Sequence, residues 1–332
     1  MAARRSTRRR FDDDTWEPAL APAHDDHRPD QHDLRRRTGD RDDGGPDADD
    51  EPVSDDPDDP TLGEPSWSTY RDATRGPRPV PSWVVTDPRA IDTEHGTVKS
   101  GKEADVSVLE RAVPPDLVAA GADGAHRCLL AVKRYRTAEH RMFHRDAGYL
   151  EGRRVRRSRE MRAMATRTAF GRDLIAGQWA AAEFAILSQL WSRGAAVPYP
   201  VQLRGTELMM ELIGETTGDA AGTAAPRLAQ LRPSRTEAHD LYHQLTIALT
   251  DLAEIGYAHG DLSAYNVLVH EGRLVLIDLP QAVDLVGNPQ GFDYLRRDCA
   301  NIATWFAAHG AAHADADDLF LRVTRAVPGV NP

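Results

Sequence analysis

The chain has 332 residues, enough for one large or two medium-sized domains with a hydrophobic core. It carries 41 basic and 52 acidic side chains, a net charge of −11, and residues 1–60 hold 19 acidic against 10 basic of these, a net −9. No run of about 18 apolar residues occurs, so we expect no membrane span, and no apolar segment follows the first arginines, so we expect no secretory signal.

Residues 1–78 are predicted to form a disordered, charged tail, and the folded domain is predicted to cover 79–332. The tail is rich in Asp, Pro, Gly and Arg and cannot bury enough apolar surface to offset the entropy lost on ordering. Five arginines among the first ten residues could contact nucleic acid. The acidic block behind them favours a self-screened, solvated tail, so direct nucleic-acid binding is not expected.

The first part of the domain is predicted to be rich in β-structure. Alternating apolar and β-branched residues predict strands, and Gly and Pro mark turns and loops. In chain order we expect a strand over Ser82–Thr86, a tight turn over Gly96–Ser100, a strand over Ala104–Glu110, a loop over Val113–Gly124 and a strand over Cys128–Tyr135. An Arg-rich insertion or loose helix is expected over 138–176.

The remainder is predicted to be mostly helical. A helix over Gln178–Ser192 precedes strands over Tyr199–Leu203 and Glu207–Leu212, and helices follow over Thr236–Ile255, Phe292–His309 and Asp315–Ala326, the last with Asp315 as its N-cap. Between them, two short strands turn at Glu271 and Gly272. This order predicts an α+β, two-lobed, protein-kinase-like fold, with a β-rich lobe over 79–213, a compact helical lobe over 214–332 and a nucleotide between them.

Two motifs carry the chemistry. HGDLSAYNVL (259–268) and VLIDLP (275–280) place Asp261, Asn266 and Asp278 at neighbouring loop ends. Phosphoryl transfer from a nucleotide–Mg²⁺ complex needs a carboxylate that accepts the proton of the attacking hydroxyl, and an amide and a second carboxylate that hold the metal. Polar loops that merely cap strands are the simpler alternative, but both motifs in this order favour a kinase-like site.

Lysine usage is also informative. Only three of the basic residues are lysine, Lys99, Lys102 and Lys133, and a compact ammonium group suits phosphate contacts. Lys133 lies on a predicted strand, where it could bridge the α- and β-phosphates with a glutamate as its partner. Glu183 is the preferred partner because it lies in an apolar, helical stretch, and Glu160 is the rival.

The segment GTVKSGK (96–102) matches G-x-x-x-x-G-K, but Glu103 stands where a P-loop needs Ser or Thr, and a strand follows instead of a helix. We therefore predict a turn between strands, in which the backbone N–H groups of Ser100 and Gly101 face phosphate. Cys128 and Cys299 have no metal or redox spacing, which favours packing roles in a cytoplasmic protein.

The chain resembles the RIO family of atypical kinases, most closely a bacterial member of the first RIO subfamily. The matching segments, in family order, are SGKEADV (100–106), AVKRY (131–135), WAAAEF (179–184), MMELIG (209–214), HGDLSAYN (259–266), IDLPQAV (277–283) and LRRDCANI (295–302). The chain departs from the family pattern at Lys99, where Ser is usual, and at Asp105, which is often Asn.

The resemblance implies site residues as well as a fold. The catalytic set would be Asp261, Asp278, Lys133 and Glu183, and the metal ligands would be Asn266 and Asp278. Nucleotide contacts would come from Ser100, Gly101, Lys102, Glu103 and Lys133 around the phosphates and from Val106. Met210 would be the gatekeeper, with Glu211, Ile213, Leu268 and Ile277 around adenine.

The implied function is an ATP- and Mg²⁺-dependent serine/threonine protein kinase or ATPase, with Mn²⁺ as an alternative ion. It would act on a protein hydroxyl, and an aspartyl phosphate on Asp278 is a candidate intermediate. A ribosomal particle enters as a partner by family analogy alone. Two alternatives stay open, an aminoglycoside-kinase-like small-molecule phosphotransferase and an ATP-switched, non-catalytic assembly factor.

Overall fold

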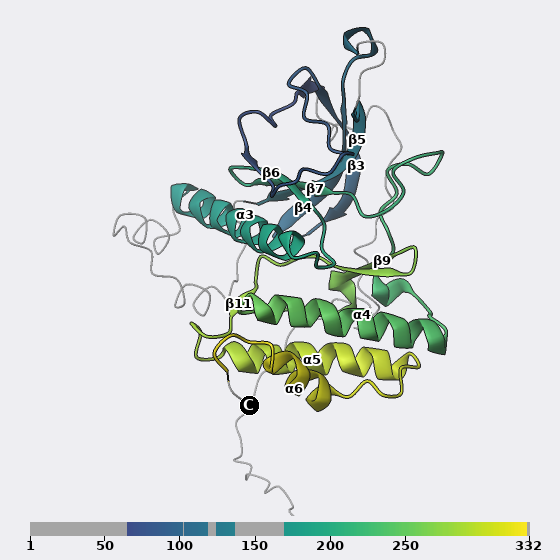
Figure 1. Cartoon of the computed structure of the whole chain (residues 1–332). Coiled ribbons are helices and arrows are strands. Elements are labelled where there is room, and N and C mark those ends of the chain that lie inside the picture. Colours follow the sequence, from purple (N-terminus) through teal and green to yellow (C-terminus); the bar gives the residue numbers. More distant parts are fainter. Residues whose placement is uncertain (1–64, 102, 119–123, 137–168, 331–332) are drawn as a thin grey trace, which may run out of the picture. The chain divides into compact units, whose positions relative to one another are not determined.

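The structure, a computed structural model, describes residues 65–101, 103–118, 124–136 and 169–330. These residues form a β-rich half and a helical half (Figure 1). The β-rich half contains an antiparallel seven-stranded sheet in the order β1-β3-β4-β5-β7-β6-β2. Its strands are β1 (Ser66–Trp67), β2 (Thr74–Arg75), β3 (Ile91–Ser100), β4 (Ala104–Ala112), β5 (Arg127–Tyr135), β6 (Pro200–Arg204) and β7 (Glu207–Glu211).

Two predictions for this sheet were wrong. Gly96–Ser100 is not a tight turn but the end of strand β3, and the chain turns after it. Gly96 has φ 127° and lies at a register shift in the β3–β4 ladder. The conformational freedom of glycine therefore allows a β-bulge at this position. Ser82–Thr86 forms turn and coil, and the apolar pattern there reflects the burial of Val84 and Val85 in the core of the sheet.

The predicted tail extends too far. Residues 65–78 belong to the fold, because β1 pairs with Ile91 and Asp92 and β2 pairs with Gln202 and Leu203. Tyr70, between these strands, is only 6% exposed. Edge strands of two residues have no periodicity that a sequence pattern could reveal.

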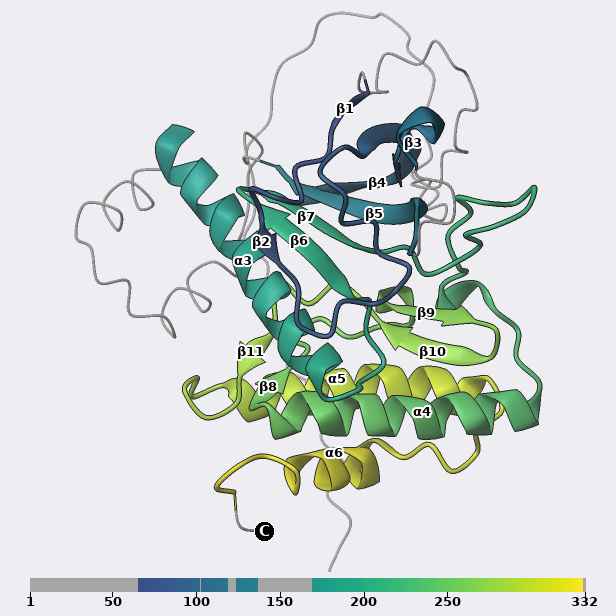
Figure 2. The ribbon, with the colours of Figure 1, turned by 45° about the horizontal axis from the view of Figure 1, so that its top comes forward.

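Helix α3 (Ala169–Ser192) lies along the sheet (Figure 2). It begins earlier than the predicted Gln178, so the last residues of the expected Arg-rich insertion are helical. The rest of that insertion, with Glu160, lies outside the described residues. Buried Leu187 and Leu190 of α3 join the largest apolar cluster, which also contains Leu208 of the sheet and Leu245 of the helical half. The two halves therefore share one core.

The helical half contains α4 (Arg235–Glu254), α5 (Gly291–Ala308) and α6 (Ala316–Thr324). Ser234 and Glu237 form a capping box at the start of α4, and Asp315 caps α6 as predicted. Two small antiparallel ladders, β9 (Val267–His270) with β10 (Arg273–Leu276), and β8 (Tyr257–Ala258) with β11 (Val283–Asp284), lie beside α4 and α5 (Figure 2). Short 3₁₀ turns are η1 (Pro115–Leu117), η2 (Leu228–Gln230) and η3 (Ala264–Asn266). Within the described ranges, no helix is long and apolar enough to cross a membrane.

Candidate active site

Lys133 joins three separate segments of the chain. Its Nζ on strand β5 lies 3.0 Å from Oε1 and 2.9 Å from Oε2 of Glu183 on helix α3, and 2.7 Å from Oδ1 of Asp278. Burial by itself disfavours the ammonium ion, but the charges of Asp278 and Glu183 outweigh it and raise the pKa of Lys133. Lys133 therefore remains a cation at the junction of the two halves.

Glu183 is fixed from several sides. It is 1% exposed, and its Oε1 also accepts the backbone N–H of Leu279 at 3.0 Å. The hydroxyl of Tyr135 donates a short hydrogen bond to its Oε2. Burial and the charge of Glu183 raise the pKa of Tyr135, so this hydroxyl keeps its proton and acts as a donor. The carboxylate thus ties helix α3 to the segment that carries Asp278.

The β9–β10 hairpin brings Asn266 and Asp278 together. Val267 pairs with Leu276, and the N–H of Ile277 donates to the carbonyl of Asn266 at 3.1 Å. Asp278 follows with φ 67°, an uncommon conformation for a residue other than glycine. Burial works to raise the pKa of Asp278, but the neighbouring Lys133 outweighs it, and the net shift is downward. Asp278 is therefore ionised at neutral pH.

Side chains hold the loop that carries Asp261 by hydrogen bonds to its backbone. The Asp261 side chain is exposed, and its carbonyl accepts the Asn266 Nδ2–H at 2.8 Å. The N–H groups on either side, of Gly260 and Leu262, donate to Asp298 of α5 at 2.7 and 3.0 Å, and Arg297 donates to the carbonyl of Gly260 at 2.7 Å. Asp298 was not among the predicted site residues. The available signal was an acidic residue inside the apolar stripe of a predicted helix, where a charge requires a partner.

Gly260 has to be glycine at this position. Its φ is +83°, and a Cβ there would lie 2.4 Å from the carbonyl oxygen of Gln281. The preceding His259 is 1% exposed, with Nε2 at 3.1 Å from the carbonyl of Ile277. Since a carbonyl only accepts, Nε2 carries a hydrogen in this contact. Both residues hold the Asp261 loop against the Asp278 segment.

The turn between β3 and β4 differs from its prediction. The N–H of Gly101 donates to the carbonyl of Ala104 at 3.0 Å, and the Ser100 hydroxyl donates to Asp105 at 2.8 Å on the outer face of the sheet. Gly101 therefore does not direct its N–H toward phosphate, because the tight turn uses it internally. Lys102 lies outside the described residues. Glu103 reaches the other half of the molecule, where it accepts a hydrogen bond from Gln281 at 2.8 Å.

A family model described as the RIO domain matches residues 118–319. Over 235 residues the chain is 35% identical to the RIO-type serine/threonine-protein kinase Rio1 of Haloferax volcanii, an alignment that covers 70% of each protein. This chain belongs to the RIO family. It is also 33% identical over 147 residues to the serine/threonine-protein kinase rio1 of Schizosaccharomyces pombe and 32% identical over 155 residues to human RIO3, covering 29% and 28% of those longer proteins.

Among solved structures, the Rio2 kinase of Chaetomium thermophilum in an ADP/Mg²⁺-phosphoaspartate complex aligns with a TM-score of 0.46 at 20% identity, covering 70% of this chain and 60% of that one. Family membership confirms the predicted RIO family and an ATP-dependent serine/threonine protein kinase. The β-rich and helical halves confirm the predicted two-lobed α+β fold. Assignment to the first RIO subfamily stays a prediction, since relatives named Rio1 and RIO3 both match.

The residues predicted to contact adenine differ in burial. Met210 is 9% exposed and belongs to the shared core, whereas Ile213, Leu268 and Ile277 are half-buried. The N–H of Glu211 donates to the carbonyl of Tyr199 at 2.9 Å, and the carbonyl of Ile213 accepts from Ala225 at 2.8 Å. Local structure thus engages these two groups. The predicted backbone contacts with adenine are therefore left to the carbonyl of Glu211 and the N–H of Ile213, and they stay a prediction. Val106, half-buried, is paired with Lys133 on the neighbouring strand.

The residues near Asp278 suit Mg²⁺. Asn266 uses its amide N–H₂ on the carbonyl of Asp261, which directs its side-chain oxygen elsewhere, and Asp278 adds a carboxylate. The described part of the chain contains no group of three or more His, Cys, Asp or Glu side chains that could hold a metal. One carboxylate and one amide oxygen match a Mg²⁺ ion that completes its shell with phosphate and water.

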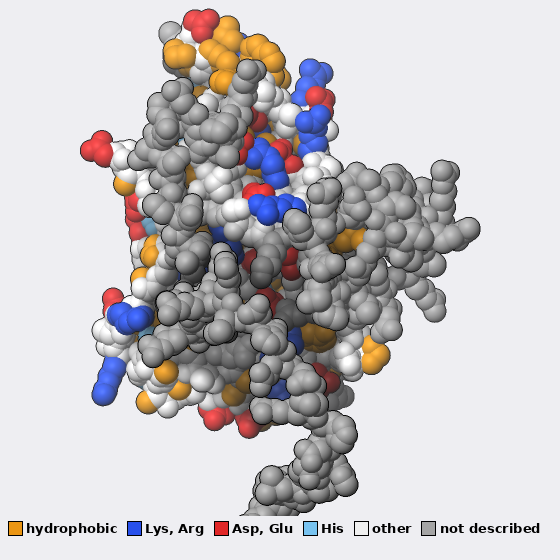
Figure 3. Space-filling view, turned by 180° about the vertical axis from the view of Figure 1, so that it is seen from behind, with side chains coloured by type: hydrophobic (Ala, Val, Ile, Leu, Met, Phe, Trp, Pro, Cys, Tyr) orange, Lys and Arg blue, Asp and Glu red, His pale blue; other side chains and the backbone are white. Residues whose placement is uncertain are grey.

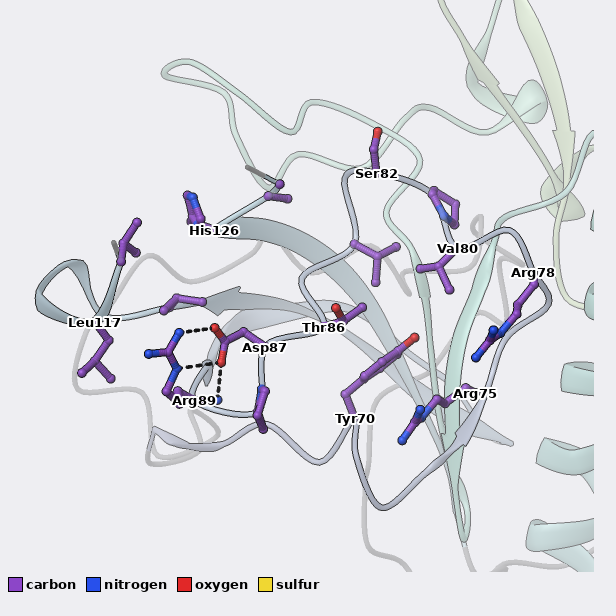
Figure 4. A pocket seen from close by; sticks show the side chains of 17 residues that line it. Tyr70, Arg75, Arg78, Val80, Ser82, Thr86, Asp87, Arg89, Leu117 and His126 are labelled. Carbon is purple, nitrogen blue, oxygen red and sulfur yellow. Dashed lines mark hydrogen bonds and ion pairs between the residues drawn. The ribbon is translucent and has the colours of Figure 1, made fainter. Parts of the chain in front are cut away.

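A separate pocket of about 830 Å³ lies in the β-rich half (Figure 4). Tyr70, Arg75, Arg78 and Val80 line it, together with Asp87 and Arg89, which form an ion pair at 2.6 Å. None of the predicted site residues that the structure describes line this pocket, so it is distinct from the candidate kinase site.

Proposed function

We propose that this RIO kinase transfers the γ-phosphoryl group of ATP to a serine or threonine hydroxyl of a protein, with Asp261 as the proton acceptor. The observation that carries the proposal is the position of Lys133 between Glu183 and Asp278. A cation held by a buried glutamate beside a metal-binding carboxylate is the arrangement that positions nucleotide phosphates.

Each residue has a separate task. Glu183 and Tyr135 hold the side chain of Lys133, whose ammonium group binds the α- and β-phosphates when it releases Asp278. Asp278 and Asn266 would hold Mg²⁺, which would neutralise the phosphate charge. The side chain of Asp261 is exposed on a loop fixed by Asp298, so a protein hydroxyl can approach it. Its carboxylate takes the hydroxyl proton as the oxygen attacks the γ-phosphorus, while the bond from phosphorus to the bridging oxygen breaks and ADP leaves.

Replacing Asp261 with Asn tests this assignment. Loss of a general base lowers turnover by about 10²–10⁴-fold, and the affinity for MgATP should remain nearly unchanged because Asp261 contacts neither phosphate nor metal in the proposal. Steady-state ADP release and equilibrium nucleotide binding measure the two quantities. Asp317→Asn, at an exposed position on α6, serves as the control. Wild-type turnover in Asp261→Asn would refute the role of this residue.

We also propose that Asp278 accepts the γ-phosphoryl group in part of the molecules. A carboxylate oxygen would form a bond to the γ-phosphorus while the bond to the bridging oxygen breaks and ADP leaves, and water would then hydrolyse the acyl phosphate. In support, the Asp278 side chain is 36% exposed and ionised. Acid quench after labelled ATP, followed by hydroxylamine, should release label from Asp278. Label found only on Ser or Thr, and stable to hydroxylamine, would leave Asp278 as a metal ligand alone.

The remaining assignments are broader. Mn²⁺ could replace Mg²⁺ at an all-oxygen site, and a ribosomal particle as the target rests on family analogy alone. Direct nucleic-acid binding is not part of the proposal, because basic side chains such as Arg134 and Arg136 pair with acidic ones, and both charge types lie close together on the face shown in Figure 3. We place the chain in the cytoplasm, a location that two free, buried cysteines favour.

A further inference from the structure

Strand β3 contains a bulge that decides where Lys99 points. Thr97 lies opposite Ser107 and Lys99 lies opposite Val106, so Val98 is an extra residue without its own partner. Side chains alternate between the faces of a sheet, and an extra residue reverses the alternation beyond it. In a regular ladder Val98 would occupy the position opposite Val106. The bulge gives this position to Lys99.

The face that Lys99 shares is the face of the active site. Val106 pairs with Lys99 on one side and with Lys133 on the other, so the three residues form a row across β3, β4 and β5. Adjacent strands are about 4.8 Å apart, which places the backbones of Lys99 and Lys133 roughly 10 Å from each other. Ser100, the next residue, points to the opposite face, where its hydroxyl contacts Asp105.

The side chain of Lys99 reaches the nucleotide region. Its Cε lies 3.9 Å from the position that a Cβ on Gly101 would take, so the aliphatic part runs along the β3–β4 turn while the residue stays exposed. Burial lowers the pKa of Lys99. The charges of Arg227 and Lys133 also lower this pKa, whereas those of Asp278 and Glu103 raise it. Lys99 therefore lies within electrostatic reach of the proposed metal ligand and of the lysine that binds phosphate.

The local charges favour an anion beside Lys99. Lys133 contacts two carboxylates, whereas Lys99 makes no ion pair with any residue that the structure describes. Arg227 adds a further positive charge from the helical half. Such a group of cations around a partly desolvated position attracts a multiply charged ligand, and a lysine presents the compact charge that suits phosphate.

We propose that Lys99 is a phosphate-binding residue of this kinase, and that its ammonium group contacts the β- and γ-phosphates of ATP while Lys133 contacts the α- and β-phosphates. This proposal rests on the nucleotide site described under Proposed function. It adds a second lysine on the strand that precedes the phosphate turn, at the position where the resembling family usually has serine. Lys99 thus makes nucleotide affinity in this chain depend on the number of phosphates.

Equilibrium binding of MgATP, MgADP and AMP to the full chain tests the proposal. Lys99→Met keeps the length of the side chain and removes the charge. It should weaken MgATP by about tenfold or more, as expected for a lost charged hydrogen bond, weaken MgADP less, and leave AMP unchanged. Lys99→Arg should retain most of the ATP affinity, and Lys99→Ser should behave like Lys99→Met.

Two controls keep the result specific. Thr97→Ala changes the same strand on the opposite face, and Arg325→Met removes an exposed charge from the helical half. Neither variant should alter the affinities for MgATP, MgADP and AMP. Thermal unfolding without nucleotide should be the same for all variants. A Lys99→Met chain that loses affinity equally for all three nucleotides, or for none, would overturn the phosphate assignment. If the wild-type chain bound no nucleotide, the proposed function itself would fail.

Discussion

Asp298→Asn should separate the positioning of Asp261 from nucleotide binding. The Asp298 carboxylate accepts the N–H groups of Gly260 and Leu262 at 2.7 and 3.0 Å and is fully buried. An asparagine keeps one acceptor oxygen and turns an N–H₂ group toward the other N–H, so one bond is lost and two donors face each other. A hydrogen bond to a charged group contributes about 1.5–3 kcal/mol.

The loss of stability should be smaller than that figure. Burial raises the pKa of Asp298, and the charge of His259 together with the two backbone N–H groups only partly offsets it. A raised pKa in the folded state means that stability falls as pH rises from the ordinary pKa through the folded value. Asparagine does not ionise and avoids this penalty. We expect a net cost of about 1–2 kcal/mol at neutral pH, with a larger cost at pH values below the folded pKa of Asp298.

The effect on catalysis should be larger than the effect on stability. A displacement of about 1 Å at a reacting group can lower the rate by about 100-fold, so we expect kcat to fall by about 10- to 100-fold while the Kd for MgATP stays near the wild-type value. Urea unfolding, steady-state turnover and equilibrium binding are the assays, with Asp317→Asn as the matched control. Turnover within about twofold of wild type would refute the role of Asp298. A loss of turnover that is fully explained by a weaker Kd for MgATP would refute it as well.

Gly260→Ala should lower the free energy of unfolding by about 2–4 kcal/mol more than the control variant Gly256→Ala. Both glycines have similar positive φ (+83° and +87°), but only a Cβ at position 260 would meet a backbone oxygen. Equal losses in urea unfolding would show that no clash exists. Deleting residues 1–64 should leave the thermal unfolding midpoint unchanged. Deleting residues 1–75 also removes β1, β2 and buried Tyr70, so it should lower the midpoint by about 5–10 °C. Identical midpoints for the two deletions would contradict the assignment of residues 65–75 to the fold. Burial raises the pKa of Cys299 to about 12 and raises that of Cys128, so neither thiol should react with a thiol reagent at pH 8 until the chain is unfolded, and rapid labelling of the native chain would disprove their burial.

Sequence alone determined the features that depend on neighbouring residues. The strand–turn–strand unit at Glu271 and Gly272 was predicted correctly, because both residues take positive φ in a tight hairpin that the sequence already suggests. The cap of α6 by Asp315 was predicted for a similar reason, since a cap is formed within one turn of helix. These local rules also placed Asn266 and Asp278 at adjacent loop ends.

Tertiary structure decided the features that depend on distant segments. The bulge at Val98 reverses which face Lys99 occupies, and a one-residue change of register leaves no mark in composition or periodicity. The short strands at residues 66–67 and 74–75 exist because other strands offer unpaired edges to them. The role of Asp298 likewise requires the packing of α5 beneath the Asp261 loop. Sequence therefore predicted the chemical groups of the candidate site, and only the folded chain determined how they are held, because their partners lie tens of residues away.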